Sequence, residues 1–162
     1  TVSNVIKNFK EVEKVYKQGK ENYDKLQAVN NLVKDARKVQ QTVLLVGNVS
    51  EMYVQNFGKM MNDPNFSPQE LAAIANGYSA LLNESTELLK ELKQIVSSSS
   101  LSLNDKERMD IIDRVDKEVI EYHCLVRYYT NKNISVSFLR AKKQNNTKRV
   151  LELYGTSNQK YW

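Results

Sequence analysis

Residues 2–46, VSNVIKNFKEVEKVYKQGKENYDKLQAVNNLVKDARKVQQTVLLV, carry apolar residues at spacings of three and four. These spacings average about 3.5 residues, the heptad period of helices that pack along a narrow apolar seam. The pattern predicts one long helix with a continuous apolar face. The seam positions are Val2, Val5, Phe9, Val12, Tyr16, Gly19, Tyr23 and Leu26, then Val29, Leu32, Ala36, Val39, Val43 and Val46.

The first helix is expected to extend to about residue 62. An apolar face continues past the seam at Val49, Tyr53, Phe57 and Met60. Gly47 and Asn48 lie between the two sets, and these residue types predict a break or kink in the helix.

A capping box predicts the start of the second helix. Pro64 and Pro68 indicate a turn at residues 63–68, because each proline lacks a backbone donor and restricts the preceding residue. Ser67 is followed three residues later by Glu70, and Pro68 falls at the first helical position. We therefore expect a helix over about residues 67–96. Its seam consists of Leu71, Ile74, Tyr78, Leu81, Ser85, Leu88, Leu92 and Ile95.

A third helix is expected over about residues 104–130. The polar run at residues 97–100 ends the second helix, and Asn104 with Glu107 provides the next N-terminal cap. The apolar positions of this third helix are Ile112, Val115, Val119, Tyr122, Val126 and Tyr129.

Residues 131–162 are expected to form a short appendage. Residues 131–133 predict a kink or loop, and a last helix over about residues 147–154 ends at Gly155 as its cap. The predicted fold is therefore all-α, a single domain of residues 1–162. It is an elongated antiparallel bundle of three long heptad-patterned helices with a short C-terminal helical appendage.

Composition agrees with one helical domain. The chain has 162 residues, of which 41% are hydrophobic, with two prolines and five glycines. No stretch approaches the roughly 18 consecutive apolar residues of a membrane span, and no signal-peptide core is visible. The chain begins at Thr1, so an export signal, if the gene encodes one, is expected to have been removed. A single cysteine, Cys124, excludes an internal disulfide and leaves the redox compartment open.

The net charge of +5 is unevenly distributed. Residues 127–160 contain eight Lys and Arg residues against Glu152 alone, a net charge of +7, so the rest of the chain carries −2. Such a basic end suits nucleic acid, anionic lipid or an acidic protein surface. The simpler interpretation is a solvated helix face that keeps the protein soluble.

Catalytic and metal-binding patterns fail on residue type or spacing. His123 and Cys124 are neighbours about 100° apart on a helix, so they cannot act as base and nucleophile. Residues 63–67 resemble the start of a calcium loop, but Pro68 replaces its required glycine. The glycines are too far apart for a phosphate-binding loop. We therefore predict a protein that is not an enzyme and has no cofactor or metal.

Aromatic residues alternate with the basic residues near the C-terminus. Rings at helical spacing more often fill a core, although single-stranded nucleic-acid binders share this composition. The terminal aromatic pair is expected to fold back on the bundle or to contact a partner. The candidate interaction surface consists of Arg140, Lys142, Lys143, Lys148, Arg149, Tyr161 and Trp162.

Several segments along the whole chain resemble TraI-type transfer proteins of Bacteroidetes conjugative transposons, which are similar to the TrbJ family. No catalytic motif carries the resemblance. The segments are residues 9–16 (FKEVEKVY), 29–40 (VNNLVKDARKVQ), 62–66 (NDPNF), 104–109 (NDKERM), 129–136 (YTNKNISV) and 153–155 (LYG), with the closing Tyr161 and Trp162.

The resemblance implies a subunit of a type IV secretion apparatus for mating-pair formation, similar to its minor pilus subunits. Such a protein would be exported to the periplasm or cell envelope and would bind other conjugation proteins. It implies no site residues. Two alternatives stay open: a cytoplasmic helical adaptor whose basic C-terminal region binds nucleic acid, and a coiled-coil oligomer formed by self-association.

Overall fold

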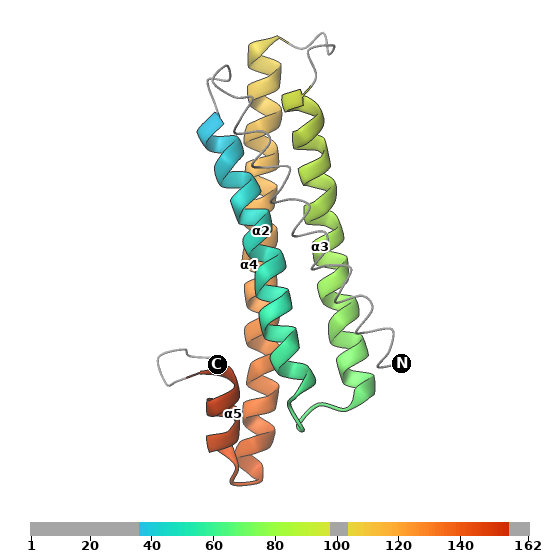
Figure 1. Ribbon diagram of the computed structural model, residues 1–162, viewed down its shortest axis with the longest axis vertical. Coiled ribbons are helices and arrows are strands. Elements are labelled where there is room, and N and C mark those ends of the chain that lie inside the picture. Colours follow the sequence, from blue (N-terminus) through green and yellow to red (C-terminus); the bar gives the residue numbers. More distant parts are fainter. Residues whose placement is uncertain (1–35, 98–103, 156–162) are drawn as a thin grey trace.

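The computed structural model describes residues 36–97 and 104–155, and these stretches are helical with short connections. The helices are α2 (Ala36–Met61), α3 (Pro68–Ser97), α4 (Asp105–Lys143) and α5 (Thr147–Tyr154). Figure 1 shows α2, α3 and α4 side by side, each running opposite to the helix before it, with α5 at one end. The expectation of an all-helical chain is confirmed for this part. The seam predicted at residues 2–35 lies outside the described residues.

The helices pack around two groups of buried apolar side chains. The group toward the α2–α3 turn contains an aromatic cluster in which the rings of Tyr53 and Tyr78 stack with centroids 4.6 Å apart. Phe57 lies 5.4 Å from Tyr53, and Tyr129 meets Tyr78 edge to face at 4.9 Å. The other group, toward the start of α2 and of α4, contains Val39, Val43, Val46, Leu88, Leu92, Ile112, Val115 and Val119.

Both predicted N-terminal caps are confirmed. Glu70 donates its backbone N–H to the Ser67 hydroxyl at 3.2 Å, and Ser67 donates its own N–H to the Glu70 carboxylate at 2.9 Å. Asn104 and Glu107 form the same reciprocal pair, with both distances 2.9 Å. Each pair satisfies N–H groups that the start of a helix leaves without an intrahelical partner.

The break predicted at Gly47 and Asn48 is wrong, because α2 continues through both residues. Val46 and Val49 on either side are buried, so packing stabilises this part of the helix. Asn48 also contacts α4, where its Oδ1 lies 2.8 Å from Nε2 of His123. Packing therefore offsets the cost of about 1 kcal/mol that a glycine adds in a helix interior.

The loop predicted at residues 131–133 and a third helix ending near residue 130 are also wrong. α4 continues to Lys143, well beyond that point. The asparagine and serine side chains of this stretch bond to the helix backbone: Asn133 donates to the Tyr129 carbonyl at 2.9 Å and Ser135 to the Asn131 carbonyl at 2.8 Å. Ile134 is buried in the core. Burial of one face therefore outweighs the weak helix propensity of these residues.

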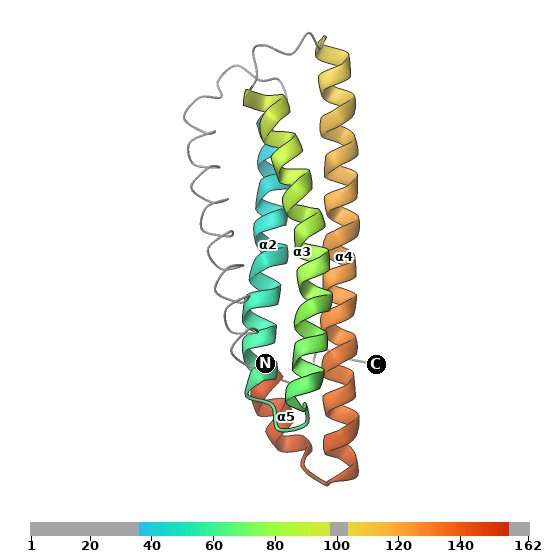
Figure 2. The same cartoon turned by 90° about the vertical axis from the view of Figure 1, so that its right-hand side faces the viewer.

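A left-handed residue turns the chain from α4 into α5. Asn145 has φ 54°, a region that asparagine tolerates better than most residues. The N–H of Asn146 bonds to the Ala141 carbonyl at 2.9 Å, and that of Asn145 to the Lys142 carbonyl at 3.3 Å. This is the Schellman arrangement that ends many helices. As Figure 2 shows, α5 then folds back beside the end of α2, and it covers the range expected from the sequence.

Gly77 allows α3 and α4 to approach closely. A Cβ atom at this position would lie 2.3 Å from the hydroxyl oxygen of Tyr129 and 2.6 Å from its Cζ. That hydroxyl donates to the Ile74 carbonyl at 3.1 Å. The missing side chain at Gly77 therefore leaves the space in which the Tyr129 ring packs against α3.

We expect Gly77→Ala to lower the free energy of unfolding by about 1–3 kcal/mol, because the Tyr129 ring must move and strain the packing. In a Tyr129→Ala background the same substitution should raise it by roughly 1 kcal/mol, since alanine is the better helix former. Urea denaturation of the four proteins measures both effects. A stabilising effect in both backgrounds would show that the close approach does not constrain the structure.

Candidate functional site

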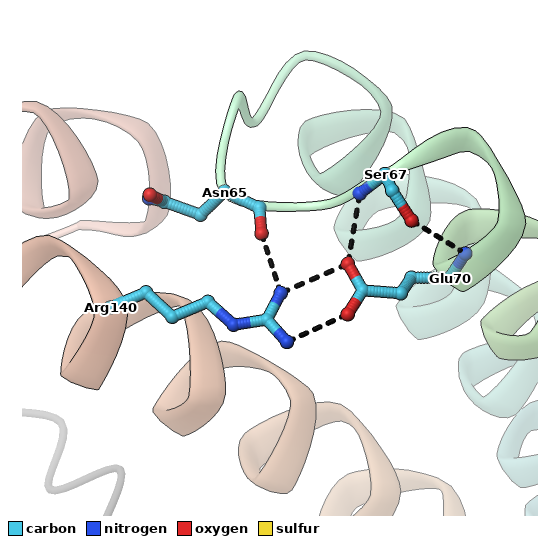
Figure 3. A network of polar contacts seen from close by, with 4 residues as sticks. All are labelled: Asn65, Ser67, Glu70 and Arg140. Atoms are coloured by element: carbon cyan, nitrogen blue, oxygen red, sulfur yellow. Dashed lines mark hydrogen bonds and ion pairs between the residues drawn. The ribbon is translucent and has the colours of Figure 1, made fainter.

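An ion pair joins the start of α3 to the last turns of α4 (Figure 3). Arg140 donates from Nη2 to Oε1 of Glu70 at 2.6 Å and from Nη1 to Oε2 at 2.9 Å. The Nη1 group also donates to the backbone carbonyl of Asn65 at 2.7 Å. Two parallel bonds between a guanidinium and a carboxylate fix the relative orientation of the two side chains.

The same carboxylate is part of the capping box, so it accepts from both helices. The Arg140 hydrogen bonds, followed by the bond from the Ser67 N–H, lower the pKa of Glu70 from 4.5 to about 2. A negative charge at this position is also favoured by the positive end of the α3 dipole. Both side chains are partly exposed, so solvent weakens the charge interaction. The pair is best interpreted as a contact that orients α4 against α3.

Next to this pair, Asp63 forms a buried polar cluster. Its carboxylate accepts hydrogen bonds from Ser137 on α4 and, at 2.6 Å, from the hydroxyl of Tyr154 on α5. The backbone N–H of Asn65 donates to the other carboxylate oxygen at 2.9 Å, which is an Asx turn. A buried charge without hydrogen-bond partners is costly in free energy, and these donors offset that cost for Asp63.

Burial raises the pKa of Tyr154 above its ordinary value, and the hydrogen bond to Asp63 and its negative charge raise it further. The hydroxyl therefore remains protonated and acts as a donor. The hydrogen bonds of the cluster connect the α2–α3 turn to α4 and α5. It is a structural junction, and we assign no reaction to it.

The residues of the predicted interaction surface have different environments in the structure. Arg140 is held by Glu70, whereas the four other basic residues of the predicted surface lie exposed around the α4–α5 turn. These are Lys142, Lys143, Lys148 and Arg149. Tyr161 and Trp162 lie outside the described residues.

Sequence reasoning missed a set of exposed apolar side chains on the outer face of α4. These are Leu125, Tyr128, Val136 and Leu139. No predicted helix has a seam position at Leu125, Val136 or Leu139. Apolar residues outside the predicted seams were the sequence feature that could have revealed this face. Apolar residues beside a buried seam indicate a second apolar face, provided that the helix is known to continue past residue 130.

Other chemistry-bearing residues do not assemble into a reactive group. Burial, and then the nearby charge of Arg127, lower the pKa of His123. The His123 ring contacts Asn48, while Cys124 is exposed. Across residues 36–97 and 104–155, no three His, Cys, Asp or Glu side chains are grouped as metal ligands would be. None of the described helices is long and apolar enough to cross a membrane.

Comparison of the chain with protein-family models, with curated proteins and with solved structures found no match.

We expect Tyr154→Phe to lower the free energy of unfolding by about 1.5–3 kcal/mol, because it removes a hydrogen bond to a buried carboxylate. Tyr128→Phe is the matched control: this ring is exposed, and its substitution should change stability by less than about 0.5 kcal/mol. Chemical denaturation of both variants measures the difference. Equal effects would mean that the Asp63 cluster contributes little to stability.

The lowered pKa of Glu70 predicts acid sensitivity. A carboxyl group with a folded pKa of about 2 and an ordinary value of 4.5 stabilises the fold above the ordinary value, and this stabilisation is lost as pH falls toward 2. The stability difference between the natural protein and Glu70→Gln should therefore shrink over that range. Denaturation at several pH values measures it.

An Arg140→Gln background is the control for this measurement. Without the guanidinium, the Glu70→Gln substitution should have a smaller and less pH-dependent effect. An unchanged pH dependence in that background would show that Arg140 does not cause the low pKa.

Proposed function

We propose that this protein is a non-enzymatic structural or assembly subunit of a conjugative DNA-transfer apparatus of the type IV secretion kind. In this proposal it works in the periplasm or cell envelope, and it binds other subunits through its helical faces. The proposal includes the finer architecture expected from the sequence, three long heptad-patterned helices with a short C-terminal appendage. The distributed resemblance to TraI-type and TrbJ-like transfer proteins supports the choice of apparatus.

The observation that carries the binding role is the outer face of α4, where large apolar side chains point to solvent. Exposed apolar groups that line up on one element are typical of protein interaction sites. The carboxylates of Asp63 and Glu70 both have structural partners. Asp63 accepts from Ser137 and Tyr154, and Glu70 accepts from Arg140. Because these hydrogen bonds hold the helices together, they support a structural role in assembly.

A cytoplasmic adaptor that binds nucleic acid is the second candidate. It is favoured by the exposed Lys142, Lys143, Lys148 and Arg149, which lie together around the α4–α5 turn. Binding of this kind releases counterions from phosphates, so its affinity falls steeply with salt. Salt-sensitive DNA binding that disappears when these four residues are neutralised would favour this candidate.

The proposed function predicts that an in-frame deletion of the gene lowers the conjugation frequency of the donor strain. Complementation with the chain behind a cleavable signal peptide should restore transfer, because the subunit acts in the envelope. The same chain without a signal peptide should fail to restore it, at matched protein levels. Unchanged transfer after deletion, or full rescue by the form without a signal peptide, would contradict the envelope role.

A further inference from the structure

The outer face of α4 carries a stripe of six residues that the bundle leaves exposed. We call Leu125, Tyr128, Lys132, Val136, Leu139 and Lys143 the α4 outer stripe. The residues are three or four positions apart, which places them on one side of a helix over about 27 Å at ~1.5 Å per residue. Val126, Ile134 and Ala141 on the opposite side are buried. The stripe thus has the spacing of a coiled-coil seam without a helix packed on it among the described residues.

Basic residues outnumber acidic ones around the stripe: Glu70 lies at a neighbouring pocket and is paired with Arg140, and Glu121 lies one turn before Leu125. Residues 122–151 contain no Asp or Glu. Lys132 lies in the middle of the stripe, with its Nζ 5.8 Å from the centroid of the Tyr128 ring. Lys142 and Lys143 are exposed at its end. The stripe is therefore both apolar and basic.

An open pocket of about 240 Å³ borders the stripe at Val136. It lies between the start of α3 and α4, with Phe66 and Ile74 among its apolar walls and Glu70 and Asn133 among its polar ones. Because Arg140 pairs with Glu70, that carboxylate is already neutralised by a fixed partner. Typical small-molecule sites begin near roughly 300 Å³, so this pocket is small for such a ligand. One large apolar side chain of a partner suits it better, because interface anchors commonly fill pockets of this kind.

We propose that the α4 outer stripe binds an acidic amphipathic helix of another protein, which places one apolar side chain in the pocket at Val136. The proposal rests on the proposed function as a subunit that binds other proteins. The spacing of the stripe matches a helix, and carboxylates flanking the partner's apolar seam would pair with Lys132, Lys142 and Lys143. In coiled coils a lysine within the seam specifies register and oligomeric state, and the charges that flank the seam set the choice of partner.

Other occupants fit the stripe less well. A second copy would bring Lys132, Lys142 and Lys143 against the same basic residues, and the stripe itself contains no acidic residue to pair with them, which is repulsive. Non-specific single-strand binding uses several stacked rings, and Tyr128 is the one aromatic residue of the stripe. A helix lying in a membrane surface keeps its charges on the polar face, whereas Lys132 is central here.

The test uses the full chain and two synthetic peptides of four heptads, each with Leu at positions a and d. One peptide carries Glu at positions e and g, and the other carries Lys there. We expect the Glu peptide to bind at least about tenfold more tightly in fluorescence anisotropy, because only it complements the stripe. Equal binding of the two peptides, or none, would overturn the proposal.

Variants locate the binding on the chain. Leu139 and Leu44 are both 56% exposed, on α4 and α2 respectively, so Leu139→Asn and Leu44→Asn are matched substitutions. Leu139→Asn should weaken binding of the Glu peptide by about tenfold, as expected for an interface anchor, and Leu44→Asn should leave it unchanged. Lys132→Glu should weaken binding of the Glu peptide and strengthen binding of the Lys peptide. Equal effects of the two leucine variants, or no effect of the charge reversal, would place binding elsewhere.

Two further measurements distinguish a partner helix from other occupants of the stripe, and distinguish failure of this inference from failure of the proposed function. Tighter binding to DNA or to vesicles with anionic lipid than to the Glu peptide, lost in Leu139→Asn, would assign the stripe to that ligand and overturn the inference. Failure of the peptide test with a transfer defect in the deletion strain would overturn the inference alone. Peptide binding at the stripe with unchanged transfer would support the inference and reject the proposed function.

Discussion

The buried carboxylate of Asp63 is the constraint on which one end of the molecule depends. It lies in the turn after α2, yet Ser137 and Tyr154, two of the donors that satisfy it, belong to α4 and α5. A buried charge that lost these donors would cost several kcal/mol. The cluster therefore requires α4 to extend well beyond residue 130, and it requires α5 to fold back toward α2. Asn145 makes that return possible through its left-handed conformation.

The position of α3 against α4 follows from contacts of two kinds. Near the α2–α3 turn, the bidentate pair of Glu70 and Arg140 sets the orientation of the two helices. About two turns further along α3, Gly77 gives the Tyr129 ring room to pack. The directional pair and the steric fit act together, because a shift of either helix along its axis would disturb both. Within the described residues, aromatic rings and the Asp63 cluster distinguish this end of the bundle. The core of the other end is made of valine, leucine and isoleucine, with a hydrogen bond from buried Thr42 to Asp116 joining α2 to α4.

The two sides of α4 consequently have different roles. Its inner side supplies Val126, Ile134 and Ala141 to the core, and its polar residues there complete the Asp63 cluster. Its outer side, apolar and basic, contributes nothing to that core. Large apolar groups exposed in a row reduce solubility unless something covers them, which is why we place the subunit contact on this face. Because Arg140 is paired with Glu70, we do not count it among the basic residues that a partner can contact.

The sequence by itself determined the helical class, the starts of α3 and α4, and the range of α5. Those features depend on capping boxes and apolar periodicity, which involve residues only a few positions apart. It did not determine the continuity of α4 through residues 131–133, the buried role of Asp63 or the pairing of Arg140 with Glu70. The last two depend on partners about 70 residues or more away in the chain, and the continuity of α4 depends on burial of Ile134 in the core. The tertiary structure decided them, because burial and long-range hydrogen bonds outweigh local propensity.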